Sequence, residues 1–445
     1  MDRGFRVVRP AAVSAIFGLL LLTSALIAPG YGSTSGYPSR ADVAPLVNSR
    51  LSGVGTHPAF GLIPSGASPV TTPPVGVIAT LAVGSDPEGA AYDASSGYVY
   101  VPNSGAANVS VISGTTVVGT VTVGSFPCAA VWDSGNGYVY VMNEYSDNVT
   151  VILGTSVVGA VNVGSGPVGG TYDSGNGLVY VTDYESAKVS VIRGTSVVGS
   201  VNVGSSPSSA VYDPGNGYVY VINEYSANVS AINGTSVVAT VPVGSGAESA
   251  VYDSDNEYVY VPNVNSGNVS VIRGTSVVGT VPVGSYPGSP VYDAGNGYVY
   301  VANVGSGSVS VISGTKVTAS LKDGSSPGSG VYDPGNGYVY VLDTLSGDLS
   351  VINGTSVVAN VPVGAGPLGA AYDARNGYTY VPDSEASNVT VVGAVSSSGG
   401  TPSPSGPGIP LWLYLVNGFV LAVFVLGVVV YLVRRRRRPP TVASF

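Results

Sequence analysis

The sequence has almost no cysteine or histidine, with Cys128 and His57 as the single copies in 445 residues. One cysteine excludes an intramolecular disulfide and a multi-cysteine zinc site. The two singletons also exclude cysteine–histidine nucleophile pairs and histidine-rich metal clusters. A Ser-His-Asp triad would depend on His57, whose Gly-Thr-His-Pro setting is typical of a solvated linker. We therefore predict that the protein is not an enzyme and has no catalytic residue, metal or cofactor.

Charged side chains are scarce too, at 9% of the chain, whereas glycine (63) and tyrosine (30) are abundant. This composition favours turns and strands over amphipathic helices, so we expect the soluble part to be all-β. Arginines cluster at the two ends, and the region between them holds 8 basic and 24 acidic residues. Because an acidic domain repels phosphate backbones, nucleic acid is not expected as a partner.

Long apolar runs occur near the two ends of the chain. Residues 11–28 follow three arginines and precede Pro29-Gly30, which is typical of a secretory signal over residues 1–30. An uncleaved signal anchor is the alternative. The stretch is slightly short for a full membrane span, which favours cleavage.

The second apolar run, residues 411–433, contains no charge and is long enough to cross about 30 Å of hydrocarbon. Trp412 and Tyr414 stand where an interfacial aromatic belt would lie, and five arginines follow at once. The positive-inside rule therefore predicts a transmembrane helix, with residues 434–445 as a basic cytoplasmic tail. The localisation expected is a single-pass cell membrane protein whose remaining part lies outside the cell.

Between these ends, the sequence repeats every 40 residues with essentially no insertions. An aromatic residue followed by aspartate anchors each of the eight copies: Tyr92-Asp93, Trp132-Asp133, Tyr172-Asp173, Tyr212-Asp213, Tyr252-Asp253, Tyr292-Asp293, Tyr332-Asp333 and Tyr372-Asp373. Each unit contains four short β-type runs, which in the second unit are Ala130 to Asp133, Tyr138 to Asn143, Asn148 to Ile152 and Val157 to Val163. Four antiparallel strands in about 40 residues are typical of a propeller blade.

The ends of the repeat array predict how the ring closes. An isolated fourth-strand sequence, Val77 to Val83, precedes the first anchor, and the last unit has only its first three strands. We expect a single β-propeller at residues 76–393, most simply with eight four-stranded blades and the N-terminal strand completing the last one. Residues 31–75 and 394–410, rich in small and polar residues, are expected to be a flexible segment and a linker.

The units resemble the YVTN family of β-propeller repeats, found in archaeal and bacterial surface-layer and surface-antigen proteins. The name-giving second strand appears as Tyr98-Val99-Tyr100-Val101-Pro102-Asn103, and the third unit departs from it as Leu178-Val179-Tyr180-Val181-Thr182-Asp183. Family members are often seven-bladed, so a seven-bladed ring is the alternative. The resemblance implies surface location and binding more than any defined reaction.

The repeated residues favour structural roles. Most of the eight aspartates begin an Asp-x-Gly-Asn-Gly turn, where the carboxylate can accept backbone N–H groups. The fifth unit instead has acids at alternate positions, from Asp253 to Glu257, but it lacks the glycine and distal glutamate of an EF-hand loop, so no metal site is predicted. The tyrosines of the second strands, such as Tyr138 and Tyr140, alternate with valine and are expected to pack between blades.

Seven Asn-x-Ser/Thr sequons lie in the part expected outside the cell. The alternative is that asparagine and serine are ordinary strand-end residues multiplied by the repeat. The N-glycosylation candidates are Asn108, Asn148, Asn228, Asn233, Asn268, Asn353 and Asn388.

The loops after the second and fourth strands vary most between units and should emerge on one face. They carry exposed aromatics beside carboxylates, which suit contact with sugars or basic protein surfaces, although neutral drift in exposed loops is the simpler alternative. Glycans on Asn148 and Asn228 would border and shield this face. The ligand-face candidates are Phe126, Glu144, Tyr145, Asp147, Tyr184, Glu185, Glu224, Tyr225 and Tyr286.

Two functions compete. The leading hypothesis is a membrane-anchored surface protein for adhesion, surface-layer assembly or recognition of an external glycan or protein. The alternative is an extracellular propeller enzyme, a lyase or hydrolase that uses carboxylates alone. Propeller enzymes usually carry unique polar residues at one end of the ring, and the sequence shows little of that.

Overall fold

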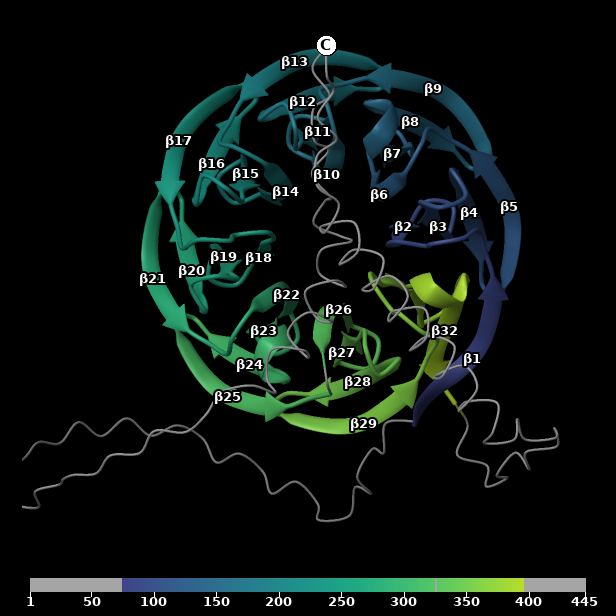
Figure 1. Ribbon diagram of the computed structural model, residues 1–445, viewed down its shortest axis with the longest axis vertical. Helices are drawn as coiled ribbons and strands as arrows, with labels where there is room; N and C mark the ends of the chain where they lie inside the picture. The colour runs from purple at the N-terminus through teal and green to yellow at the C-terminus, as the bar shows by residue number, and fades with distance from the viewer. Residues whose placement is uncertain (1–73, 325, 396–445) are drawn as a thin grey trace, which may run out of the picture. The chain divides into compact units, whose positions relative to one another are not determined.

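The computed structural model describes residues 74–324 and 326–395, which form a β-propeller of eight blades (Figure 1). Each blade is a four-stranded antiparallel sheet, so the prediction of eight blades is confirmed over seven. The predicted signal, transmembrane segment and cytoplasmic tail lie outside the described residues. Among the residues that are described, no helix is long and apolar enough to cross a membrane.

The first four blades follow one another along the chain. Blade one has β2 (Ala91–Asp93), β3 (Tyr98–Asn103), β4 (Asn108–Ser113) and β5 (Thr116–Thr122). Blade two has β6 (Pro127–Trp132), β7 (Val139–Asn143), β8 (Asn148–Leu153) and β9 (Ser156–Asn162). Blade three has β10 (Pro167–Asp173), β11 (Leu178–Asp183), β12 (Lys188–Arg193) and β13 (Ser196–Asn202). Blade four has β14 (Pro207–Asp213), β15 (Tyr218–Asn223), β16 (Asn228–Asn233) and β17 (Ser236–Pro242).

The remaining blades repeat the pattern. Blade five has β18 (Val251–Asp253), β19 (Tyr258–Asn263), β20 (Asn268–Arg273) and β21 (Ser276–Pro282). Blade six has β22 (Pro287–Asp293), β23 (Tyr298–Asn303), β24 (Ser308–Ser313) and β25 (Lys316–Lys322). Blade seven has β26 (Pro327–Asp333), β27 (Tyr338–Asp343), β28 (Asp348–Asn353) and β29 (Ser356–Pro362). Blade eight has β30 (Ala371–Asp373), β31 (Tyr378–Asp383), β32 (Asn388–Ala394) and β1 (Val75–Ala82).

Three loops after second strands form single 3₁₀ turns, η1 (Glu144–Ser146), η2 (Val304–Ser306) and η3 (Ser384–Ala386). The first strand of the second unit begins at Pro127 rather than at the predicted Ala130. Pro127 pairs with Asn143 and Ala129 with Met142. The register shifts between these two pairs, so the strand continues past the part in which its residues alternate regularly.

The core lies between neighbouring blades. Tyr140, Met142 and Val149 of blade two pack against Val179 and Val181 of blade three, and eight clusters of this kind follow the ring. Second strands are buried on both faces because a blade covers each side. Fourth strands form the outer ring in Figure 1 and expose part of their valines to solvent.

The second-strand tyrosines also join blades through hydrogen bonds. Tyr220 Oη donates to the carbonyl of Gly274 in the next blade at 2.8 Å, and Tyr260 does the same to Gly314 at 2.9 Å. Tyr380 makes this contact from blade eight to Gly114 of blade one at 3.0 Å. The predicted packing role of these tyrosines is confirmed, and burial accounts for their raised pKa values.

Ring closure follows the predicted strand sharing. β1 pairs antiparallel with β32, from Val75 opposite Ala394 to Ala82 opposite Asn388. A second link lies nearer the axis, where the Arg375 guanidinium donates to the carbonyls of Ala94 and Ser95 at 2.7 and 2.6 Å. The outer edge strand of blade eight therefore comes from the other end of the chain.

Candidate functional site

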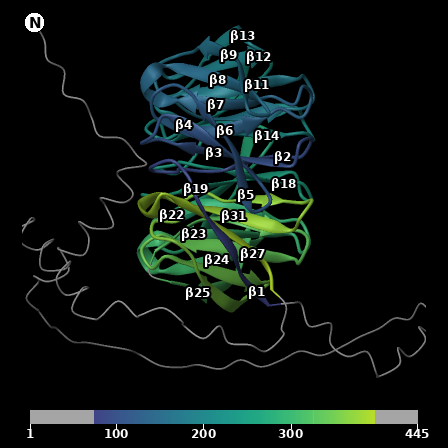
Figure 2. The same ribbon diagram turned by 90° about the vertical axis from the view of Figure 1, so that its right-hand side faces the viewer.

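Backbone hydrogen bonds place the loops after second and fourth strands on the same face of the propeller. The N–H of Glu144 donates to the carbonyl of Phe126 at 3.0 Å, and Tyr145 N–H donates to Ser125 at 3.2 Å. The N–H of Val163, in the next such loop, donates to the carbonyl of Asp147 at 3.1 Å. We call these loops the variable face; Figure 2 shows the propeller edge-on, with its strands running between the two faces.

The loops of the variable face share one backbone conformation, whereas their side chains differ from blade to blade. The last loop residue before the third strand has positive φ in each of several blades, 51° at Asp147, 52° at Ala187 and 56° at Gly307. Aspartate, alanine and glycine therefore occupy one backbone position. The scaffold is fixed by backbone contacts, and residues in these loops are free to differ between blades.

A stacked aromatic pair occupies blade two. The rings of Phe126 and Tyr145 lie 4.4 Å apart at an interplanar angle of 22°, and Tyr145 remains 56% exposed. Tyr286 takes the position of Phe126 in blade six, where it lies over Gly305, the counterpart of Tyr145. A Cβ at Gly305 would clash with the Tyr286 ring, so glycine leaves room for this aromatic residue.

A second aromatic pair joins blades three and four. The rings of Tyr184 and Tyr225 meet edge to face, 6.2 Å apart at 68°, and Tyr225 is 68% exposed. Tyr184 Oη donates to Glu224 Oε2 at 2.9 Å. Burial is the main cause that raises the pKa of Tyr184, followed by its contacts with Tyr225 and Glu224.

Two glutamates outside the predicted set of face residues interact with members of that set: Glu248 with Glu224, and Glu88 with Glu144. Burial first, and then the charge of Glu224, raise the pKa of Glu248 to about 7. Burial likewise raises the pKa of Glu88, which accepts a 2.7 Å hydrogen bond from Ser104 and faces the charges of Asp86 and Glu144. Glu144 itself is 5% exposed.

These residues make the propeller asymmetric. Glu88 and Glu248 occupy the second residue of the strand-one segment in blades one and five, where blades six to eight have Gly288, Gly328 and Leu368. Glu144 and Glu224 follow the second strand in blades two and four. Aligning the units in 40-residue columns would have revealed these exceptions, because both positions are otherwise apolar, small or hydroxyl-bearing.

The other predicted face residues divide into structural and exposed ones. Asp147 is exposed, yet its Oδ1 accepts the N–H of Gly166 at 2.9 Å, so this carboxylate also holds the next loop. Glu185 is exposed, and its N–H donates to the carbonyl of Ser165 at 3.1 Å. The structure adds one exposed apolar residue, Leu345, which is 56% accessible and stands at the position of Tyr145 in blade seven.

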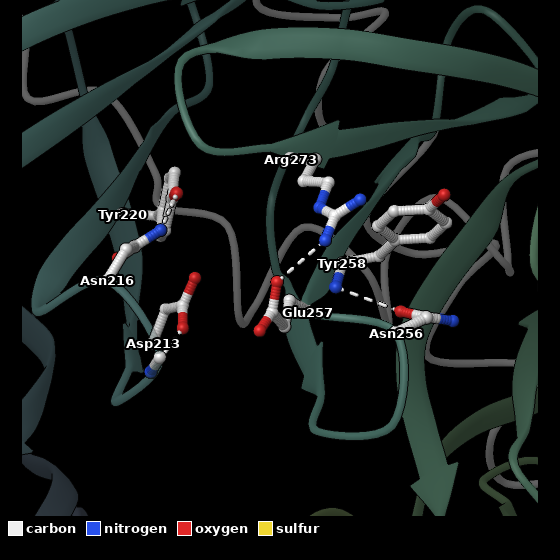
Figure 3. A network of polar contacts seen from close by, with 8 residues as sticks. Asp213, Asn216, Tyr220, Asn256, Glu257, Tyr258 and Arg273 are labelled. Atoms are coloured by element: carbon white, nitrogen blue, oxygen red, sulfur yellow. Dashed lines mark hydrogen bonds and ion pairs between the residues drawn. The ribbon is translucent and has the colours of Figure 1, made fainter.

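The repeated aspartates have the predicted turn role. Asp213, labelled in Figure 3, accepts the N–H of Gly215 through Oδ1 at 2.8 Å. The Tyr252 hydroxyl of the next blade contacts the same carboxylate. In the exceptional fifth unit, Asp253 Oδ1 likewise accepts the N–H of Asp255 at 2.9 Å, and Glu257 pairs with Arg273 at 2.8 Å. Within residues 74–324 and 326–395, no group of acidic, histidine or cysteine side chains is arranged to hold a metal.

The sequons fall into two structural classes. Five begin a third strand and are partly buried, and in most of them the asparagine Oδ1 accepts a hydrogen bond from the second strand: Asn108, Asn148, Asn228, Asn268 and Asn388. Asn233 and Asn353 are exposed at the last position of a third strand, next to the turn that leads into the fourth strand. These turns lie on the face opposite the variable face, so glycans on them would not shield it.

Comparisons with solved structures identify the fold. A streptogramin B lyase has a TM-score of 0.51 and 10% identity over 71% of this chain and 97% of that chain. Virginiamycin B lyase from Staphylococcus aureus has a TM-score of 0.50 and 11% identity, over 71% and 98%. The WD40 β-propeller domain of Doa1 has a TM-score of 0.50 and 12% identity, over 73% and 98%. No family model matches the chain, and no curated protein matches it. At these identities, the likeness defines a β-propeller and no function.

Proposed function

We propose that the protein is a membrane-anchored cell-surface binding protein whose propeller presents the variable face to an external glycan or protein. The exposed aromatic residues of this face carry the proposal, because Tyr145 and Tyr225 are accessible and are not members of the buried clusters between blades. Large exposed aromatic side chains are the residues that dominate binding energy in interfaces. The apolar segment at 411–433 and the arginines after it support the anchor.

An extracellular enzyme is the second candidate. The observation that favours it is Glu248, because a carboxyl group with a pKa of about 7 suits acid–base catalysis. One lyase structure with this fold is of a variant described as catalytically inactive, in which alanine replaces a histidine. The described residues of the present chain contain no histidine, so binding is the better-supported role.

The test is a binding assay of the full-length protein on glycan and cell-surface arrays. Replacing Tyr145, Tyr184 and Tyr225 with alanine should abolish binding and leave the melting temperature nearly unchanged. Val198→Ala, on the exposed outer ring, is the matched control and should bind normally. Unchanged binding by the triple variant would exclude the variable face. In intact cells, a tag after Phe445 should resist protease and a tag near residue 60 should not; the opposite pattern would refute the anchor.

A further inference from the structure

Tyr184, Tyr225, Glu224 and Glu248 form a corner on the variable face at the junction of blades three, four and five. The hydrogen bond from Tyr184 to Glu224 fixes the first ring, and Tyr225 stands edge to face against it. Glu248, from the adjacent blade, adds a second carboxylate close enough for the two charges to interact. We call these four residues the tyrosine–glutamate corner.

The two carboxyl groups of this corner have no partner of opposite charge among residues 74–324 and 326–395. No lysine or arginine occurs between Arg193 and Arg273, a stretch that includes all of blade four and most of blade five. Among the described residues, no basic side chain pairs with Glu224 or Glu248. Burial opposes ionisation of both carboxyl groups. The same low dielectric strengthens the electrostatic attraction of an external positive charge, compared with its attraction to a solvated carboxylate.

The chain contains an internal example of the matching recognition. In blade five, Arg273 pairs with Glu257 at 2.8 Å, and its guanidinium carbon lies 6.0 Å from the centre of the Tyr258 ring (Figure 3). A glutamate and a tyrosine thus hold one cation by charge and by the face of the ring. The tyrosine–glutamate corner offers the same two elements without the cation, and its Tyr225 ring is the most exposed large hydrophobic side chain among the described residues.

We propose that the tyrosine–glutamate corner binds a lysine or arginine side chain of a partner protein, with the cation between the carboxylates and the exposed tyrosine ring. This inference rests on the proposed function and narrows its ligand from a glycan or protein to a basic protein surface. The stacked pair of Phe126 and Tyr145 differs, because its rings lie face to face and the neighbouring Glu144 is buried.

Titration of the full-length protein with Nα-acetyl-arginine methylamide and Nα-acetyl-lysine methylamide tests the proposal. The matched uncharged probes are the citrulline and Nε-acetyl-lysine analogues. We expect the cationic probes to bind at least ten-fold more tightly, and Glu248→Gln and Tyr225→Ala each to reduce that affinity about five-fold or more. Glu88→Gln, at the same repeat position as Glu248, and Val198→Ala, on the exposed outer ring, should leave it unchanged.

Proton release gives a second measurement. A bound cation favours the ionised form of Glu248, whose charged neighbour is Glu224, the acceptor of the Tyr184 hydroxyl. Binding should therefore strengthen from pH 6 to pH 8 and release protons near pH 7. Equal affinity for charged and uncharged probes, or full affinity in Glu248→Gln, would overturn the inference. If array ligands still require the three tyrosines while cationic probes do not bind, this inference fails and the proposed function stands.

Discussion

Asp323 is an acidic residue at a position where every other blade junction has valine, and its replacement by valine should stabilise the protein. The equivalent residues are Val83, Val123, Val163, Val203, Val243, Val283 and Val363. Both carboxylate oxygens of Asp323 are buried, and burial raises the pKa of the group. Asp343 of blade seven is 1% exposed, and its pKa is raised to about 7, by burial first and then by the charge of Asp323.

The magnitude follows from linkage. The ordinary pKa of Asp343 is 3.8, so the shift to about 7 corresponds to about 4 kcal/mol if all of it were lost on unfolding. Only the part due to Asp323 is removed by the substitution, and solvent screening reduces it further, to roughly 1 kcal/mol. Burial of a valine side chain adds about 1–2 kcal/mol. We expect Asp323→Val to stabilise the protein by about 2 kcal/mol at pH 8.

The pH dependence provides the sharper assay. A folded-state pKa above the unfolded value means that the native protein binds more protons, so stability should fall as pH rises from about 4 to about 7. Chemical denaturation between pH 4 and pH 8 should show this slope in the parent protein and a smaller slope in Asp323→Val. Asp323→Asn separates charge from hydrophobicity, and Val283→Asp should destabilise. An unchanged slope together with unchanged or lower stability at pH 8 would refute the coupling of the two carboxyl groups.

Two further predictions concern glycans and closure. If the protein is glycosylated, mass spectrometry should find N-glycans on Asn233 and Asn353 and not on Asn108, Asn148 or Asn228, because the latter side chains are partly buried and hydrogen-bonded; the reverse occupancy would contradict this. Deletion of residues 76–85 should abolish cooperative unfolding or cause aggregation, because it removes the partner of β32. Deletion of residues 51–60 is the length-matched control, and equal melting of the two variants would show that strand sharing is dispensable.

The fold was predictable because one unit of sequence occurs eight times. The aromatic-Asp anchor recurs in each unit, so every copy indicates the same strand boundaries. The Val77 to Val83 segment has the sequence of a fourth strand, and only the last unit lacks a fourth strand of its own. A period in the sequence fixes which strands share a blade. It does not reveal contacts between blades, and for that reason the hydrogen bond from Tyr220 to Gly274, 54 residues away, could not be predicted.

The candidate face was predictable only in part, for the same reason. Tyr145 and Tyr225 could be predicted as face residues, because an aromatic residue in an exposed loop can be recognised from the sequence of one unit alone. Glu248 was missed because its significance depends on Glu224, which lies in the preceding blade and approaches it only after the ring forms. The burial of Glu144 was equally hidden, because the loop sequence gives no indication that one of its side chains points inward.

Exceptions to the repeat can be divided by whether the fold compensates for them. Trp132 replaces the tyrosine whose hydroxyl would contact Asp93, and its buried Nε1 has no hydrogen-bond partner. In the turn that follows Asp93, Ser95 and Ser96 replace the usual glycine and asparagine. Their hydroxyls each donate to Asp93 at 2.6 Å. These serines supply the contacts that the tryptophan cannot make. Glu248 and Tyr225 have no such compensating change, and a residue that breaks a local rule without structural benefit is the kind expected at a functional site.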